Sequence, residues 1–283
     1  MNSKALLVDG HNFLFRGYHG VPQEAKRPDG TSINAVYGFF SLLRKIQRKI
    51  DFGYLVVIFD SETSMDQKRT VRPEYKANRP LEHDSIYSQL PLIKNSLELL
   101  GITWIESKSF EADDLIGTYA EMFSQQNIHS YIASSDCDFM QLVSKDVSVM
   151  RGNHGNVDIY DIPKVFTNFG VSPKQCVDYL ALVGDPSDNI KGIKGIGKKR
   201  ASELLSKHKD IKSIYTSLDS LSGTLKRLLD GYENLLINQK KFLEIKKSLK
   251  LEDEFKIRDY SFSKDILPDK MGKFLDDNWE KLI

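Results

Sequence analysis

The chain has 283 residues, of which 40% are hydrophobic and 28% charged, with a formal net charge of +1. This is an ordinary soluble composition, long enough for one large α/β domain or two smaller ones. Cys137 and Cys176 lack metal-finger spacing, which excludes a disulfide framework or zinc site and favours a reducing, cytoplasmic setting. No apolar run approaches about 18 residues and no signal-peptide h-region is present, so we expect a soluble, unexported protein outside the membrane.

Strands and helices alternate along the first part of the chain. Short apolar runs predict buried parallel strands, and helical spacing of apolar residues predicts the helices between them. The predicted strands are 4–9, 54–60, 102–105, 129–134 and 147–150, with 157–160 pairing as a hairpin with the segment before Asn153. The predicted helices are 34–50, 85–100 and 111–123. We therefore expect an α/β fold with a mostly parallel central sheet flanked by helices.

Two stretches depart from this alternation. Residues 61–82 have no clean period and indicate an excursion from the sheet, and from Pro163 onward helix and turn patterns replace strands. Predicted helices at 172–182 and 198–206 flank a glycine-rich turn, whereas 271–283 show no evident structure. We predict an α/β core over residues 1–165 and a helical region over 166–283.

Acidic residues recur where predicted strands stop or helices begin. They are Asp9, Asp60, Glu111, Asp113, Asp114, Asp136, Asp138, Asp185 and Asp188. Because ligand sites of open α/β sheets lie at the carboxyl edge of the strands, we expect these side chains to gather there. Taken singly, such an Asp is more often a helix cap or turn residue, and acids in a first helical turn complement the helix dipole. Neither alternative explains the whole set.

So many carboxylates in one cleft would repel one another, and raised pKa values or bound cations must relieve that repulsion. Oxygen ligands favour Mg²⁺ or Mn²⁺. Two such ions about 4 Å apart support phosphodiester hydrolysis. No Ser-His-Asp or Cys-His arrangement competes with this interpretation. The remaining surface would then be basic and suited to a polyanion, although a well-mixed solvated surface has the same total charge.

The excursion carries a cluster of cations beside an aromatic ring. Arg72, Lys76 and Arg79 fall at i, i+4 and i+7 next to Tyr75. Such a face could track phosphates while the ring stacks on a base, and a solvated helix face with a packed tyrosine is the alternative.

A second basic cluster follows the glycine-rich turn. Gly192, Gly195 and Gly197 let backbone amides approach a phosphate at a helix start. The accompanying cations are Lys194, Lys198, Lys199 and Arg200. A hairpin of this kind holds duplex backbone without reading bases, so binding should be sequence-independent and salt-sensitive. A helix-helix turn with solubilising lysines is the alternative.

Several longer motifs occur in a fixed order along the chain. They are 6–10 (LLVDG), 14–19 (LFRGYH), 35–39 (AVYGF), 58–60 (IFD), 75–80 (YKANRP), 111–118 (EADDLIGT), 138–143 (DFMQLV) and 184–190 (GDPSDNI). This series resembles the 5′ nuclease (flap endonuclease) family, in particular the 5′ to 3′ exonuclease domain of bacterial DNA polymerase I and its standalone relatives. The resemblance implies a PIN-like 5′ nuclease fold with a helical arch over residues 61–90 and a helix-hairpin-helix around 184–206.

The resemblance also implies roles for individual residues. Asp9, Asp60, Glu111, Asp113 and Asp114 match a first metal site, and Asp136, Asp138, Asp185 and Asp188 match a second. Lys76 and Arg79 would lie at the scissile phosphate, and Arg16, Arg72, Tyr75 and the 192–200 residues named above would contact DNA. The hairpin of relatives holds potassium through main-chain carbonyls, which here would belong to Leu182, Val183, Lys191, Ile193 and Ile196.

Three departures from the family pattern are visible. Cys137 stands where a lysine is common, Lys191 and Lys194 replace the usual prolines or small residues, and the usual Phe-Arg pair before Tyr75 is missing. The chain ends at Ile283 without room for a polymerase module, so we expect a standalone nuclease or an excised domain.

We predict a Mg²⁺-dependent, monomeric 5′ nuclease of replication and repair. Its substrates would be DNA with 5′ flaps, nicks or free 5′ ends, and RNA primers. The alternatives are a catalytically weak DNA-junction binder, which would have no reason to keep every acid, and a ribonuclease of the PIN class. PIN domains are much shorter and lack the basic excursion and the glycine hairpin.

Overall fold

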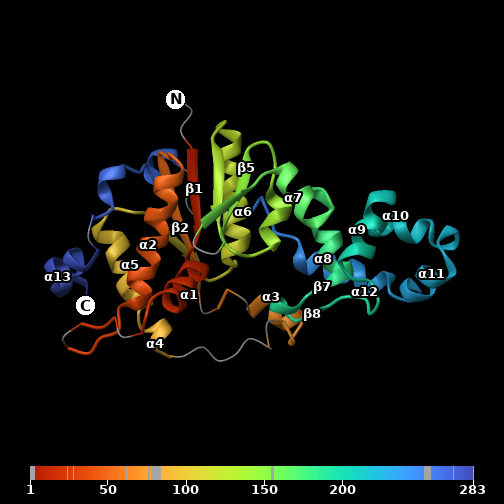
Figure 1. The fold of residues 1–283 in the computed structure, drawn as a ribbon, viewed down its shortest axis with the longest axis horizontal. Helices are drawn as coiled ribbons and strands as arrows, with labels where there is room; N and C mark the ends of the chain where they lie inside the picture. Colours follow the sequence, from red (N-terminus) through yellow and green to blue (C-terminus); the bar gives the residue numbers. More distant parts are fainter. Residues whose placement is uncertain are drawn as a thin grey trace.

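A six-stranded sheet forms the centre of the protein in the computed structural model (Figure 1). The structure describes residues 4–23, 25–27, 29–61, 63–64, 66–75, 77, 84–153, 156–251, 256–269 and 271–282. The strand order is β3-β2-β1-β4-β5-β6, and all neighbours are parallel except the β5–β6 hairpin. The strands are β1 (Lys4–Asp9), β2 (Tyr54–Asp60), β3 (Trp104–Ser107), β4 (His129–Ala133), β5 (Val147–Asn153) and β6 (Asn156–Tyr160). The predicted mostly parallel sheet and its terminal hairpin are thus confirmed.

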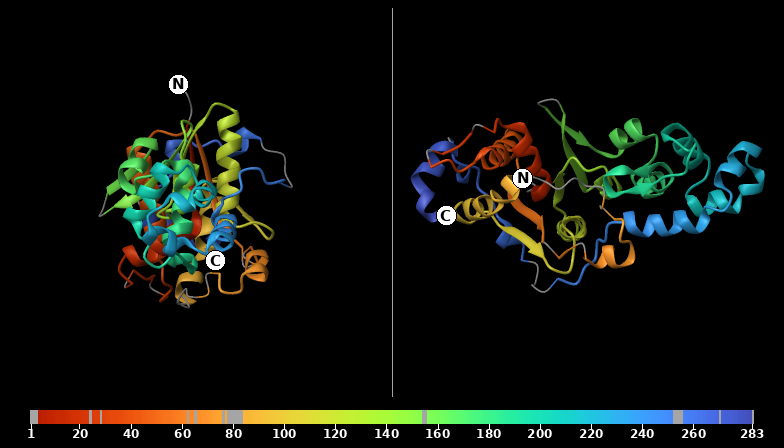
Figure 2. Two further views of the ribbon diagram at one scale, coloured as in Figure 1. Left: turned by 90° about the vertical axis from the view of Figure 1, so that its right-hand side faces the viewer. Right: turned by 90° about the horizontal axis from the view of Figure 1, so that it is seen from below.

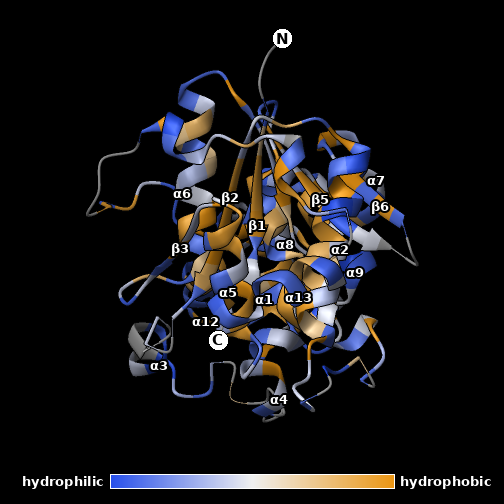
Figure 3. Ribbon diagram, turned by 90° about the vertical axis from the view of Figure 1, so that its left-hand side faces the viewer, coloured by the Kyte–Doolittle hydropathy of each residue, from blue (hydrophilic) through white to orange (hydrophobic). Residues whose placement is uncertain are grey.

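Both faces of the sheet are covered, which is why its strands read as unbroken apolar runs. In β1, Leu6 and Val8 belong to one hydrophobic core, and Ala5 and Leu7 belong to the other. Figure 3 shows these strands as a hydrophobic centre beneath more hydrophilic helices. The helices of the first core are α1 (Gly10–Gly20), α2 (Asn34–Lys49), α5 (Leu90–Leu99) and α13 (Met271–Leu282), whereas α6 (Ala112–Gln125) covers the opposite face.

The pair α1 and α2 packs backbone against backbone. A Cβ atom on Gly38 would lie 2.3 Å from the Cα of Gly17, so no side chain fits at this crossing. Sequence patterns did not indicate α1, because its glycines lower helix propensity. Close packing against α2 therefore stabilises α1 despite its low helix propensity.

The arch region is only partly described. It contains α3 (Asp66–Val71) and α4 (Asp84–Tyr87), which lie along the lower edge of the view in Figure 1. Because α3 ends at Val71, Arg72 and Tyr75 lie in a turn. Lys76 and Arg79 fall outside the described residues.

Beyond the sheet, the chain builds a helical region at one end of the molecule (Figure 2). It contains α7 (Ile162–Phe169), α8 (Cys176–Val183), α9 (Lys198–Lys207), α10 (Ile211–Thr216), α11 (Gly223–Leu229) and α12 (Glu233–Leu243). A two-stranded ribbon, β7 (Gly184–Asp185) with β8 (Ile190–Lys191), links α8 to the glycine-rich turn. Short 3₁₀ turns are η1 (Asp138–Leu142), η2 (Pro173–Gln175), η3 (Pro186–Asp188), η4 (Leu218–Ser220), η5 (Ile257–Tyr260) and η6 (Lys264–Ile266).

The C-terminal residues return to the opposite end of the molecule. The prediction that 271–283 lack structure is wrong, since α13 packs beside α2 and α5. Arg27 holds it by an ion pair with Asp276 (2.9 Å) and by lying 3.9 Å from the ring centre of Trp279. The sequence of α13 does not show that this helix packs on α2 and α5, and only the folded chain shows that contact. Among the described residues, no helix is long and apolar enough to cross a membrane.

Candidate metal centre

The carboxyl ends of the central strands carry acidic side chains. Asp9 ends β1 and Asp60 ends β2, while Ser134 and Asp136 follow β4 on the other side of β1. The connections after β1 and β4 lead to opposite sides of the sheet, and ligands of open α/β sheets bind at the carboxyl ends of strands at such a switch point. The strands therefore place Asp9 and Asp60 at the carboxyl edge of the sheet.

Asp9 is buried and held by its neighbours. It accepts hydrogen bonds from the backbone N–H of Asn12 (3.0 Å) and from Oγ of Ser134 (2.7 Å). Burial raises the pKa of Asp9 to about 6, against the lowering effect of these hydrogen bonds and with added repulsion from Asp60 and Asp136. The last contribution places these three carboxylates in one electrostatic neighbourhood.

Asp60 joins the end of β2 to the start of α6. Its Oδ1 accepts the backbone N–H of Ala112 at 2.8 Å, and its own N–H donates to Nδ1 of His11 at 3.1 Å. The first N–H groups of a helix have no partner within the helix, so a carboxylate there accepts a hydrogen bond and interacts favourably with the helix dipole. The cap alternative is correct for Asp9, which is the N-cap of α1, whereas the N-cap of α6 is Glu111 and Asp60 reaches that helix from the end of β2.

The acids that open α6 are also engaged by protein cations. Glu111 is buried, forms an ion pair with Lys68 of α3, and accepts a hydrogen bond from the Tyr75 hydroxyl (3.2 Å). Asp114, equally buried, accepts the backbone N–H of Lys246 (2.9 Å) and lies 3.7 Å from its Nζ. We call Asp9, Asp60, Glu111, Asp113 and Asp114 the first acid set.

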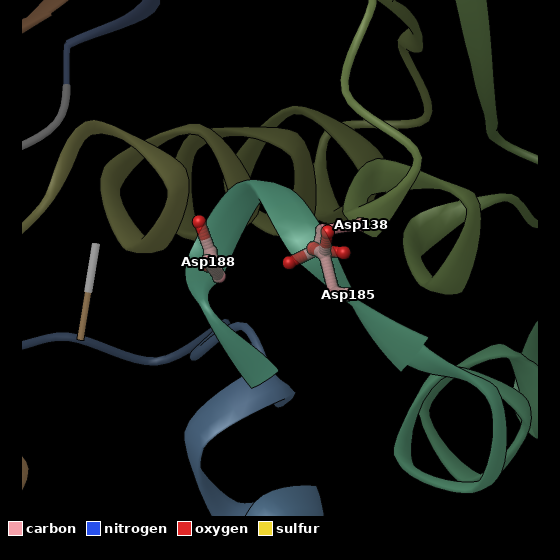
Figure 4. A group of neighbouring side chains, drawn as sticks. All are labelled: Asp138, Asp185 and Asp188. Carbon is pink, nitrogen blue, oxygen red and sulfur yellow. The ribbon is translucent and has the colours of Figure 1, made fainter. Parts of the chain in front are cut away.

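A second group of acids converges on one point. Asp138, Asp185 and Asp188 each offer an oxygen, and these oxygens lie within 4.8 Å of one another; we call them the convergent triad. Asp138 comes from η1, and the other two come from the ends of the η3 turn between β7 and β8 (Figure 4). Two local turns far apart in sequence therefore meet at one point.

Local hydrogen bonds set the shape of these turns. Asp136 Oδ1 accepts the N–H of Asp138 at 2.9 Å, and Asp185 Oδ1 accepts from both the N–H (2.9 Å) and Oγ (2.6 Å) of Ser187. Asn189 then takes a left-handed backbone conformation (φ 57°), which suits Asn and reverses the chain into β8. The turn residues thus aim Asp185 and Asp188 at Asp138.

The triad is electrostatically strained. Burial, followed by repulsion from Asp136, Asp185 and Asp188, raises the pKa of Asp138 well above its ordinary value. Its Oδ1 is buried, and within the described part of the chain it has no hydrogen-bond partner. A buried polar atom without a partner is costly, and a hard cation would satisfy it while neutralising the repulsion. The triad therefore fits a divalent metal ion.

The predicted DNA contacts have more varied surroundings. Tyr75 is only 1% exposed, so it offers no open face for a base in this structure, and packing against Phe242 (ring centres 6.3 Å apart) explains its burial. Arg72 pairs with Glu74 and lies over the same phenylalanine. Arg16 is half-buried against the backbone of Gly152, and burial, followed by Arg151, lowers its pKa.

The glycine-rich hairpin is built by close backbone packing. A Cβ on Gly192 would lie 2.1 Å from the carbonyl of Val183, and Gly184 has a φ of 89°. Gly197 precedes α9, and Lys194, Gly195 and residues 197–200 are exposed. The hairpin thus presents a helix start and its cations to solvent, as the sequence predicts.

Two cations at the acid cluster were not predicted. Lys68 lies in a stretch without periodicity, and Lys246 lies beyond α12, in a segment that packs so closely on α6 that a Cβ on Gly117 would lie 2.7 Å from its carbonyl. Nothing in the sequence around either lysine indicates its carboxylate partner. Pairing across that many residues is a property of the folded chain alone.

Comparison with known families agrees with this architecture. The family described as "5′-3′ exonuclease, N-terminal resolvase-like domain" matches residues 4–170, and "5′-3′ exonuclease, C-terminal SAM fold" matches residues 171–264. Among solved structures, a zinc-bound T5 5′-exonuclease covers 99% of this chain and all of its own, with a TM-score of 0.68 and 21% identity. The catalytic core of Rad2 bound to DNA substrate covers 84% of this chain and 74% of its own, with a TM-score of 0.53 and 19% identity.

Curated relatives are more similar in sequence. A 5′-3′ exonuclease of Aquifex aeolicus is 38% identical over 74% of this chain and 71% of its own, and one of Mycoplasma pneumoniae is 34% identical over 88% of each. DNA polymerase I of Borreliella burgdorferi is 33% identical over 92% of this chain, which spans only 29% of that polymerase. With both family domains matched in order over the expected fold, the chain belongs to the 5′-3′ exonuclease (flap endonuclease) family of nucleases.

Proposed function

We propose that this nuclease hydrolyses phosphodiester bonds near 5′ ends of DNA in a structure-specific manner, using two divalent cations, Mg²⁺ or Mn²⁺. The observation that carries the proposal is the convergent triad, in which three carboxylate oxygens lie within 4.8 Å of one another and Asp138 Oδ1 is buried without a hydrogen-bond partner among the residues described. The named relatives support it, since one T5 flap endonuclease structure is described as a complex with DNA and metal ions.

In this proposal the convergent triad and Asp136 hold one cation, and the first acid set holds the other. When bound, such cations lower the pKa of a water molecule and stabilise the attacking and leaving oxygens at phosphorus. The exposed start of α9, with Lys198, Lys199 and Arg200, would bind duplex phosphates and orient the substrate. Lys76 and Arg79 would orient the scissile phosphate.

The deciding experiment measures cleavage of 5′-labelled flap, nicked and single-stranded DNA with Mg²⁺ or with EDTA. We expect cleavage of flap or nicked DNA only with Mg²⁺, and loss of cleavage in Asp114→Asn and Asp185→Asn. Asp219→Asn is the matched control, because Asp219 pairs with Lys226 on an exposed face of the helical region. Cleavage in EDTA, or full activity of Asp185→Asn, would contradict the mechanism, and DNA binding without cleavage would favour a junction-binding role.

A binding assay tests the hairpin separately. Lys198→Ala should weaken DNA binding and reduce the salt dependence by about one phosphate contact, whereas Lys226→Ala should leave both nearly unchanged. Equal effects of the two substitutions would remove the hairpin from the DNA-binding surface.

We carry a potassium ion at the hairpin forward as a narrower proposal. Of the five predicted carbonyls, Leu182 already accepts the N–H of Ile193 (2.9 Å) and Lys191 accepts Nε2 of Gln239 (2.7 Å), so an ion would share these oxygens. Replacing K⁺ by Na⁺ at constant ionic strength should weaken DNA binding. Identical affinity in the two salts would argue against the ion.

A further inference from the structure

Two residues of the arch region converge on one carboxylate of the first acid set. Lys68 and Tyr75 both contact Glu111, whose side chain is only 2% exposed. The Lys68 side chain is itself largely covered, with 22% exposed, and its Nζ lies 5.4 Å from the Tyr75 ring centre. We call residues 66–75 the arch segment. The arch segment therefore covers Glu111 with an ammonium group and a hydroxyl group.

The surroundings of Lys68 extend beyond this single ion pair. Burial by itself would lower the pKa of Lys68, but attraction to Glu111, then to Asp114 and Asp113, outweighs burial and raises that pKa. The ammonium group thus lies within the field of the carboxylates that open α6. These carboxylates are the ones proposed to hold a metal ion.

The arch segment is also attached to the convergent side of the site. The Nδ2 of Asn189, which follows Asp188, donates to the backbone carbonyl of Glu74 at 2.8 Å. The Arg72 guanidinium lies 5.8 Å from the ring centre of Phe242 on α12. Figure 1 shows α3 beside β7 and β8, in agreement with these contacts. The closed position of the segment is thus held by contacts to α6, α12 and the η3 turn.

Lys68 and Tyr75 engage the two carboxylate oxygens of Glu111, Oε2 and Oε1 respectively, so a divalent cation that binds Glu111 competes with Lys68. Like charges at ion-pair separation repel strongly in a partly desolvated site, and each would claim the same carboxylate. Binding of a cation to Glu111 therefore favours displacement of Lys68, and Tyr75 then loses the ionic contact that helps to cover it.

We propose that Lys68 is a built-in counter-ion of the first acid set, which a divalent cation displaces, so that cation binding releases the arch segment from its closed position. The proposal rests on the proposed function, because it takes Glu111 as a cation ligand. Displacement of Lys68 lowers the affinity of the first acid set for the cation. It also explains why the arch segment would open when the cation binds.

Cation affinity tests the competition directly, without substrate or turnover. Mn²⁺ binding to the full chain is measured by calorimetry and by the loss of the free-ion paramagnetic resonance signal. Lys68→Met and Lys68→Gln should bind Mn²⁺ more tightly than the unaltered chain, by on the order of tenfold at the weaker site. Lys226→Met, which removes an exposed lysine from an ion pair elsewhere, should not change the affinity.

Hydrogen exchange of residues 66–75 tests the release. We expect Mn²⁺ to accelerate exchange in the unaltered chain, and Lys68→Met to exchange rapidly already without Mn²⁺. The counter-ion proposal is overturned if both Lys68 variants bind Mn²⁺ with unchanged or weaker affinity, or if Mn²⁺ does not alter the hydrogen exchange of residues 66–75. If the unaltered chain binds no Mn²⁺ at all, the proposed function fails instead, so the two failures are distinguishable.

Discussion

The first acid set and the convergent triad are neighbours, yet the fold treats them differently. Asp9, Asp60, Glu111 and Asp114 contact backbone N–H groups, two serine hydroxyls, a tyrosine hydroxyl and two lysines. The triad instead brings carboxylate oxygens within 4.8 Å of one another, and none of the described residues forms a hydrogen bond to Asp138 Oδ1. Neighbouring carboxylates can therefore differ: some are hydrogen-bonded or ion-paired by the protein, and others have oxygens positioned to bind a cation.

The difference follows from the elements that carry the acids. Strand ends and a helix start expose backbone N–H groups, which hold Asp9 and Asp60. In the η1 and η3 turns, the N–H groups of Asp138 and Ser187 donate to Asp136 and Asp185. No described N–H group donates to Asp138 Oδ1. A cation should thus be most needed at the triad, which four predictions test.

The largest effect should come from removing a triad carboxylate. Asp138→Asn should reduce the single-turnover rate of flap cleavage by on the order of 10³-fold, because several kcal/mol of charge stabilisation at phosphorus depend on the cation held there. Asp219→Asn is the control. A loss smaller than about tenfold would show that the triad is not where the cation acts.

The next effect is a difference in sign between Glu111 and Asp138 in metal-free protein. Glu111→Gln should lower the free energy of unfolding by about 3 kcal/mol, because it leaves Lys68 buried without its closest partner. Asp138→Asn should raise it by about 1–2 kcal/mol, because it removes one of several repelling charges. Urea denaturation in EDTA at pH 7 measures both. Changes of the same sign would remove the distinction drawn here.

Asp9 belongs to the first acid set but, like Asp138, it has a pKa raised by burial, so removal of its charge should stabilise the metal-free protein. Its pKa is about 6 in the folded protein against an ordinary 3.8, so protonation favours the folded state and stability falls as pH rises through this window. In EDTA, Asp9→Asn should match the unaltered chain below about pH 4 and be more stable by about 3 kcal/mol above pH 6. A stability difference that is constant from pH 4 to pH 7 would contradict the raised pKa.

The smallest effect concerns one donor to Asp9. Ser134→Ala removes the 2.7 Å hydrogen bond to Asp9 Oδ2, so the Asp9 pKa should rise further, by less than about one unit. Carboxyl carbon NMR titration of the metal-free protein measures it. A fall in that pKa would mean that Ser134 does not stabilise the charged form.

Much of the fold was evident from local pattern. The predicted strands 4–9 and 54–60 coincide with β1 and β2, because strands buried on both faces must be apolar throughout. The helix predicted over 85–100 is two helices, α4 and α5, because Pro91 in the first turn of α5 has no N–H to donate to the carbonyl of Tyr87. At this break the Gln89 side chain bonds Asn34 and Ala35, a tertiary contact that local pattern does not show.

The sequence by itself determined that acids stand at the ends of buried strands and at turns, and therefore that they meet at one edge of a sheet. Only the tertiary structure decided which of them converge and that Lys68 and Lys246 pair with Glu111 and Asp114. It also decided that Tyr75 is buried and that α13 packs on α2 and α5. The physical reason is range. Hydrophobic periodicity acts over one turn or one strand, whereas an ion pair depends on where distant segments pack.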